Sequence, residues 1–263
     1  MRPTEPPRFA AGTFTPAPGA GRPFTMLAAQ AGIELRLALR GGEQVLLTLL
    51  IPTALLIGLT LVTLVPLPDP RVAAVTPGVL ALAVMSTAFT AQAITLGFDR
   101  RYGVIRRLAA TALPRWLLVA GRLVAVLGVV VVQVVVLTAI ALALGWRPAV
   151  DGVGWAVLLV LLGCLAFGAL GILVGGTLRA EVTLAVANLI WLVLVFVGGI
   201  VVPIDEMPRG LAAVAQWLPT AALADGLRTS LATGAAPSEQ QVLVLVVWAL
   251  LAGSAAVRLV RWR

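Results

Sequence analysis

The chain has 263 residues, of which 60% are apolar and only 11% are charged, with a net charge of +8. Soluble domains carry about 25% charged residues, whereas here predominantly apolar stretches recur that are long enough to cross about 30 Å of hydrocarbon. The composition excludes a soluble globular protein and predicts an all-α membrane protein with several spans.

Missing residue types exclude most catalytic sites. The sequence has no histidine, so Ser-His-Asp and Cys-His arrangements and the H-E-x-x-H zinc motif cannot occur. It has no lysine, which a Walker A nucleotide site requires, and its one cysteine, Cys164, lies in an apolar stretch. We therefore predict no catalytic residue, metal site or cofactor on this chain, which makes an intramembrane enzyme a remote alternative.

The N-terminal region divides into two segments. Residues 1–24 contain six prolines and no apolar core of the kind that signal peptides have, which predicts a disordered tail. Residues 25–42 predict a helix as far as Arg40, with Gln30, Glu34 and Arg36 on one broad side and apolar residues opposite. This pattern is typical of an amphipathic helix that lies in the membrane interface.

Residues 43–263 predict a domain of six transmembrane helices. The expected spans cover about residues 43–65, 77–98, 116–144, 153–178, 182–202 and 241–257. The first contains Pro52, a residue that kinks helices. The fourth contains Gly171 and Gly175, a G-x-x-x-G pair that permits close helix contact.

The distribution of arginine predicts the orientation. Six spans place both termini on one side, and that side holds 15 of the 19 basic residues, whereas the acidic residues divide 5 and 6. The positive-inside rule then places both termini in the cytoplasm. Because the arginines flank spans and form no separate basic domain, we expect a lipid bilayer around the chain and no nucleic-acid partner.

Neutral polar residues occur within the predicted spans. Ser86, Thr87 and Thr90 lie in the second span and Asn188 lies in the fifth. We assign these four to a translocation path, while hydrogen bonding between helices remains the alternative for each of them and for Gln133. No acidic residue lies in the middle of a span, which disfavours coupling to an ion gradient.

The segment between the fifth and sixth spans, residues 203–233, is substantially apolar but is interrupted by Pro203, Pro208 and Pro219. Pro208 can begin a short helix, and Pro219 ends it before a second one. Each helix is too short to span. Together they predict a re-entrant helical hairpin that enters the outer leaflet between the spans.

A charged segment, Asp99 to Leu108, separates the second and third spans and contains four of the 19 arginines. Ile105 and Leu108 are three residues apart, so a short helix here would have a mixed face that could enter a groove of another protein. The alternative is a solvated loop whose arginines only set the topology.

Two stretches resemble motifs of one family. Phe98 to Leu108 is similar to the E-R-E-x-G-T-L-x-x-L signature that follows the second span of ABC-2 type transporter permeases. Gly199 to Pro203, Met207-Pro208 and Leu218-Pro219 are similar to the G-x-x-x-P and L-P positions that lead into the outer re-entrant helices of that family. The sequence departs from the signature in its more basic character, with Arg101 in place of an acidic residue.

The resemblance implies the ABC-2 (type V exporter) fold and the membrane subunit of an ATP-driven exporter in a bacterial cell membrane, moving a drug, an antibiotic or a lipid. It implies a separate P-loop ATPase in two copies, which would hold ATP and Mg, and a second permease half, identical or paralogous. The residues implied in docking the ATPase are Asp99, Arg100, Arg101, Tyr102, Gly103, Val104, Ile105, Arg106, Arg107 and Leu108, with a smaller contact at Arg179 and Glu181. A stand-alone secondary transporter or channel is the alternative, which the lack of intramembrane carboxylates disfavours.

Overall fold

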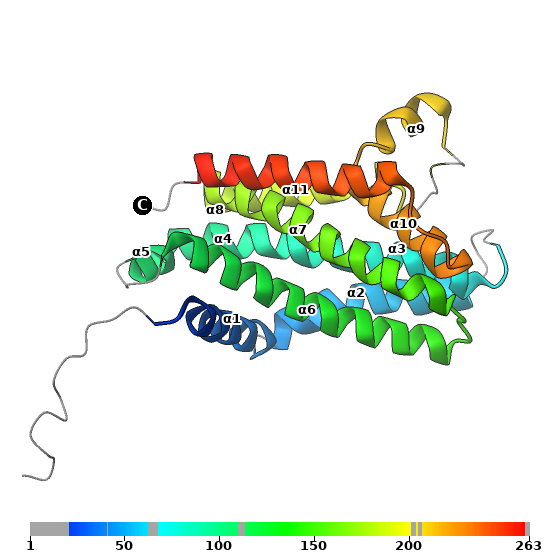
Figure 1. Ribbon diagram of the computed structural model, residues 1–263, viewed down its shortest axis with the longest axis horizontal. Coiled ribbons are helices and arrows are strands. Elements are labelled where there is room, and N and C mark those ends of the chain that lie inside the picture. The colour runs from blue at the N-terminus through cyan, green and yellow to red at the C-terminus, as the bar shows by residue number, and fades with distance from the viewer. Residues whose placement is uncertain are drawn as a thin grey trace, which may run out of the picture.

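The computed structural model describes residues 21–40, 42–62, 68–109, 114–200, 204 and 207–260, and all regular secondary structure in these ranges is helical. The helices form an elongated bundle, and most of them run along its long axis (Figure 1). Five helical stretches are long and apolar enough to cross a bilayer, namely Arg71–Arg101, Trp116–Ala143, Val150–Thr177, Ala180–Val197 and Glu239–Leu259. These stretches confirm an α-helical, multi-pass membrane protein.

The expected first span corresponds to helix α2. It covers Gly42–Leu61 and contains Pro52, and its apolar stretch within the described side chains is Thr48–Leu61. The guanidinium of Arg71 donates to the Leu59 and Val62 carbonyl oxygens and so ties the end of α2 to the next helix. Six spans therefore stay a prediction, with five supported by length and composition.

The predicted N-terminal helix is present as α1, Pro23–Arg40, and its polar residues divide between the bundle and the outside, with Arg36 exposed. Gln30 is buried against α6, whereas Ile33 and Leu37 are 56% and 65% exposed. The side chain of Gln30 also covers Gly121 of α6, where no Cβ competes for the space. Exposed apolar side chains next to exposed arginine suit a membrane surface, and the interfacial position of this helix stays a prediction.

The second predicted span forms the central column of the bundle. It runs through α3 (Arg71–Met85), the π-helical segment η1 (Ser86–Ala91) and α4 (Gln92–Arg101), and α2, α6, α7, α8 and α10 all pack on parts of it. The helix begins at Arg71 rather than at the expected residue 77, because the extended Pro70 precedes it and Pro77 is accommodated inside it. Met85 and Phe89 are almost fully buried in this column.

The glycine pair of the fourth predicted span brings two helices close together. Helix α7 (Val153–Thr177) packs Gly171 and Gly175 onto the backbone of η1 and α4. A Cβ added at Gly171 would lie 2.8 Å from the Phe89 carbonyl oxygen, and one added at Gly175 would overlap the Ala93 carbonyl. The predicted close helix contact is confirmed, and it holds the end of α4 against the end of α7.

Three further helices complete the bundle and expose apolar faces. They are α6 (Arg115–Ala143), α8 (Ala180–Val197) and α11 (Glu239–Leu259), the last of which begins with a capping box between Ser238 and Gln241. Val135 of α6 is 61% exposed, Leu189 of α8 61% and Leu250 of α11 67%. Such outward apolar surface is expected where lipid, and not water, surrounds the helices.

The region after α8 contains two short helices, as predicted. Helix α9 (Arg209–Ala215) follows Pro208, and α10 (Pro219–Thr233) begins with Pro219 in its first turn; Pro203 lies outside the described residues. α9 projects from the bundle, whereas α10 is packed among α3, α7 and α11 (Figure 1). The Arg228 side chain pairs with Asp225 and donates to the carbonyl oxygen of Gly199, the glycine whose φ of +73° ends the preceding helix.

Candidate functional site

The charged segment lies at the end of the bundle opposite to α9 and α10 (Figure 1). Helix α4 ends at Arg101, Tyr102 and Gly103 form a turn, and α5 (Val104–Ala109) follows as a short helix. Gly103 has a φ of +70°, a conformation that side chains disfavour, which explains a glycine at this turn. The short helix that the sequence predicts is therefore present.

Asp99, the first residue of the segment, points into the bundle. Its carboxylate pairs with Arg122 of α6, and the Arg122 guanidinium also lies 3.7 Å from the Glu34 carboxylate of α1. Gln30 donates a hydrogen bond of 3.1 Å to Glu34. The Arg122 side chain is only 11% exposed, and its two acidic partners are 23% and 22% exposed. This ionic cluster (Glu34, Asp99 and Arg122) joins α1, α4 and α6.

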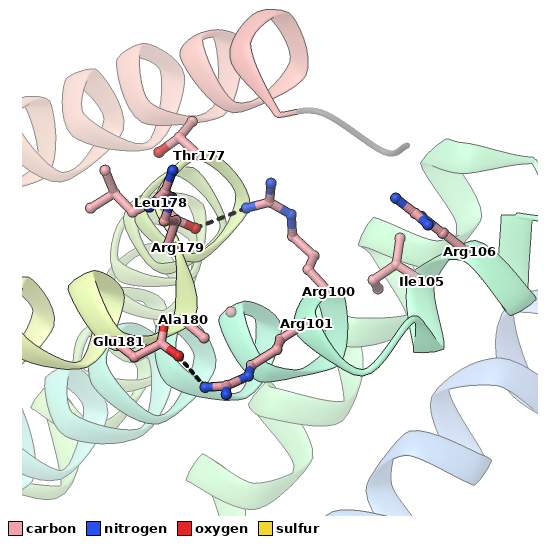
Figure 2. Close-up of a pocket in the computed structure, with 10 residues that line it drawn as sticks. Arg100, Arg101, Ile105, Arg106, Thr177, Leu178, Arg179, Ala180 and Glu181 are labelled. Carbon is pink, nitrogen blue, oxygen red and sulfur yellow. Dashed lines mark hydrogen bonds and ion pairs between the residues drawn. The ribbon is translucent and has the colours of Figure 1, made fainter.

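Arg100 and Arg101 join the charged segment to the turn between α7 and α8. The Arg100 guanidinium donates to the carbonyl oxygens of Gly175 and Leu178, at 3.0 and 3.1 Å, which satisfies groups that the end of α7 leaves without helical partners. Arg101 pairs with Glu181 in the first turn of α8 (Figure 2). The two docking segments that the sequence predicts separately thus lie next to each other on one surface.

Helix α5 turns its apolar side inward and its charged side outward. Ile105 is 6% exposed and packs in a small cluster with Leu96 and Ile172, so it does not offer its side chain to a partner as expected. Tyr102 is 64% exposed and stacks on Phe98, with ring centroids 6.1 Å apart.

The exposed side chains of the segment are Arg101, Tyr102, Arg106 and Arg107. They form the part of the charged segment that another protein could contact directly. Arg107 donates to the Tyr102 carbonyl oxygen at 3.1 Å, which holds the turn to the following helix.

The polar residues within the spans divide into two groups. Thr87 donates to Gln133 of α6 at 2.8 Å, and Gln133 in turn donates to the Thr48 carbonyl oxygen of α2. Ser86 accepts a hydrogen bond of 2.8 Å from the indole of Trp191. Both serve contacts between helices. Thr90 and Asn188 do not share these bonds; the Thr90 hydroxyl is buried with no hydrogen-bond partner, and Asn188 is exposed on α8.

The sequence did not reveal that Arg122, Asp99 and Glu34 are ion-pair partners. Arg122 reads as a snorkelling residue near a span end, and Glu34 reads as part of an exposed polar side. The available signal was that Arg122 is the single charge between Trp116 and Ala143 of a long apolar helix. Such a charge needs a carboxylate nearby, although nothing in the sequence says which one.

In the described ranges, no group of three or more Cys, Asp and Glu side chains could hold a metal ion.

Comparison with known proteins agrees with this architecture. Residues 31–232 match the family model described as ABC-2 type transporter. A protein of Bacillus subtilis (strain 168) named "Putative transport permease YvfS" is 27% identical over 234 residues, which cover 87% of this chain and 94% of that protein. The matched region includes α2 to α8, α10 and the whole charged segment.

Proposed function

Because the chain belongs to the ABC-2 type transporter family, and is thereby a membrane component of an ABC transporter, we propose that it is the permease subunit of an ATP-driven exporter. Its cargo is a lipophilic small molecule, such as a drug or antibiotic, or a lipid, and it moves out of the cytoplasm or the inner leaflet. The single observation that carries the proposal is the attachment of the charged segment to α1 and α6 through the ionic cluster and to the α7–α8 turn through Arg100 and Arg101.

The attachment suits a segment that transmits force. A separate P-loop ATPase contacts the exposed side of α5 and the α7–α8 turn, and two ATPase copies that hold ATP and Mg close on each other during the cycle. Because α4 continues through η1 into α3 without a break, a displacement of α5 reaches the buried centre of the bundle along one helical column. The π-helical η1 is the irregular point in that column, and such segments frequently mark functional sites.

The remaining parts follow from the same proposal. Two permease halves, identical or paralogous, form the translocation path between them, in a bacterial cell membrane with both termini in the cytoplasm. Asn188 lies on an outward face of α8. Because contact between a polar side chain and lipid is unfavourable, we assign Asn188 to the translocation path or to the contact between the two permease halves. α9 and α10 serve as the outer re-entrant hairpin that closes the extracellular end.

The docking experiment reverses charge where α5 is exposed. The variant Arg106→Glu/Arg107→Glu should no longer co-purify with the P-loop ATPase that the wild-type chain retains, because the side chains that meet the ATPase would repel it. The matched control is Arg209→Glu/Arg258→Glu, which changes the same total charge at exposed positions outside the charged segment and outside the α7–α8 turn. Normal ATPase retention by the α5 variant would contradict the docking assignment.

The alternative function, a stand-alone secondary transporter or channel, makes the opposite prediction. Liposomes that contain the purified chain alone would then show flux driven by an ion gradient. ATP-dependent transport that needs the second subunit, with no flux from the chain alone, supports the exporter.

A further inference from the structure

A cavity of about 430 Å³ lies between the charged segment and the α7–α8 turn (Figure 2). Its lining comes from two stretches that are far apart in sequence, one in α4 and α5 and the other at the end of α7 and the start of α8. The polar part of the lining consists of Arg100, Arg101, Arg106, Arg179 and Glu181, with Thr177 at the edge. Ile105 and Leu178 add apolar surface.

The charges around this cavity do not balance. Four arginines and one glutamate give a formal charge of +4 − 1 = +3 for the lining. Glu181 is paired with Arg101, and Arg100 donates to backbone carbonyls of α7. Arg106 and Arg179 are exposed, and among the described residues neither has a carboxylate within ion-pair distance. The cavity therefore has two guanidinium groups that can bind an anion.

The position of the cavity places it at the membrane surface. Its lining belongs to the last turns of α4 and α7 and the first turn of α8, which are the levels where these apolar helices end. Just beyond Glu181, Val182 and Leu189 of α8 are seven residues apart and so share a face of the helix, and they are 44% and 61% exposed. A molecule with a charged head at the arginines could thus lay an apolar tail along the outward face of α8.

We propose that this cavity binds the phosphate of an anionic phospholipid headgroup, with Arg106 and Arg179 as its main ligands. Guanidinium groups bind phosphate oxygens through two parallel hydrogen bonds, and basic pockets between transmembrane helices on the cytoplasmic side bind lipid headgroups. The inference rests on the proposed function for the cytoplasmic orientation of this end. Because the proposed ATPase contact includes the same exposed side of α5, the cavity is assigned to the lipid in the chain without the ATPase. A soluble phosphate offers the same headgroup chemistry but has no tail for the face of α8.

The test uses the purified full-length chain without any ATPase. Native mass spectrometry would measure binding of phosphatidylglycerol, of uncharged phosphatidylcholine with the same acyl chains, and of glycerol 3-phosphate as the soluble headgroup. We expect phosphatidylglycerol to bind at least tenfold more tightly than the other two. The variant Arg106→Gln/Arg179→Gln should weaken phosphatidylglycerol binding by about thirtyfold, since each arginine near an anionic lipid contributes about fivefold. Both positions are exposed, so the substitutions leave the packed core unchanged.

The matched control is Arg36→Gln/Arg258→Gln, which removes two exposed arginines outside the cavity and should leave phosphatidylglycerol binding within about threefold of wild type. The proposal fails if the cavity variant binds phosphatidylglycerol like the control. It also fails if glycerol 3-phosphate binds as tightly as the lipid, which would identify a soluble phosphate as the ligand. Equal binding of phosphatidylglycerol and phosphatidylcholine would also overturn it, because the cavity would then not select the anionic headgroup. Failure of the wild-type chain to retain a P-loop ATPase, with phosphatidylglycerol binding as expected, would overturn the proposed function alone.

Discussion

Replacement of Arg122 by glutamine tests whether the ionic cluster holds the charged segment in place. The substitution keeps most of the side-chain volume and removes the one cation that lies between Asp99 and Glu34. Breaking a buried ion pair typically costs about 3–5 kcal/mol, because the partner charge stays buried without compensation. Here both carboxylates keep about a fifth of their surface exposed, so we expect the lower end, about 3 kcal/mol.

The measurement is thermal unfolding of the purified chain in one detergent at fixed lipid content. A loss of about 3 kcal/mol corresponds to a melting temperature about 6–12 °C lower. Adding Asp99→Asn to Arg122→Gln should recover about half of that loss, because the uncompensated charge next to the vacated guanidinium is gone. Arg258→Gln, an exposed arginine on α11, serves as the control and should shift the melting temperature by less than about 2 °C. If the melting temperature of Arg122→Gln were lowered no more than that of Arg258→Gln, the reasoning would be refuted.

Two further substitutions test the packing around the central column. Gly175→Ala should lower the melting temperature by about 4–8 °C, since the added methyl group overlaps a carbonyl of α4 and overpacking costs about 1–3 kcal/mol. The control is Gly154→Ala, where an added Cβ has no other atom within 4 Å and should not lower the melting temperature. Gln133→Leu removes two hydrogen bonds between helices, worth about 0.6 kcal/mol each. It should lower the melting temperature by about 2–5 °C, and adding Thr87→Val should restore most of that loss. A further, additive loss from the second substitution would show that the two side chains act independently.

The sequence by itself determined the class of the protein and the place of its main charged surface. Apolar stretches long enough to cross a bilayer require helices, because backbone groups in hydrocarbon must bond within their own segment. The absence of lysine excluded a Walker A site on this chain. The short helix after the second span, the helices around Pro219 and the close contact at Gly175 were all predictable, since each depends on local residue types.

Only the tertiary structure decided which charges face inward and which face a partner. Asp99 and Arg101 are two residues apart in one charged segment, yet the first pairs with Arg122 inside the bundle and the second with Glu181 at its surface. Helical periodicity gives the angle between two side chains on one helix, but it does not give the helix that each one meets. The partners lie 23 and 80 positions away, so the inward and outward sides of the charged segment are set by how α7 and α8 pack on α4 and how α1 packs on α6.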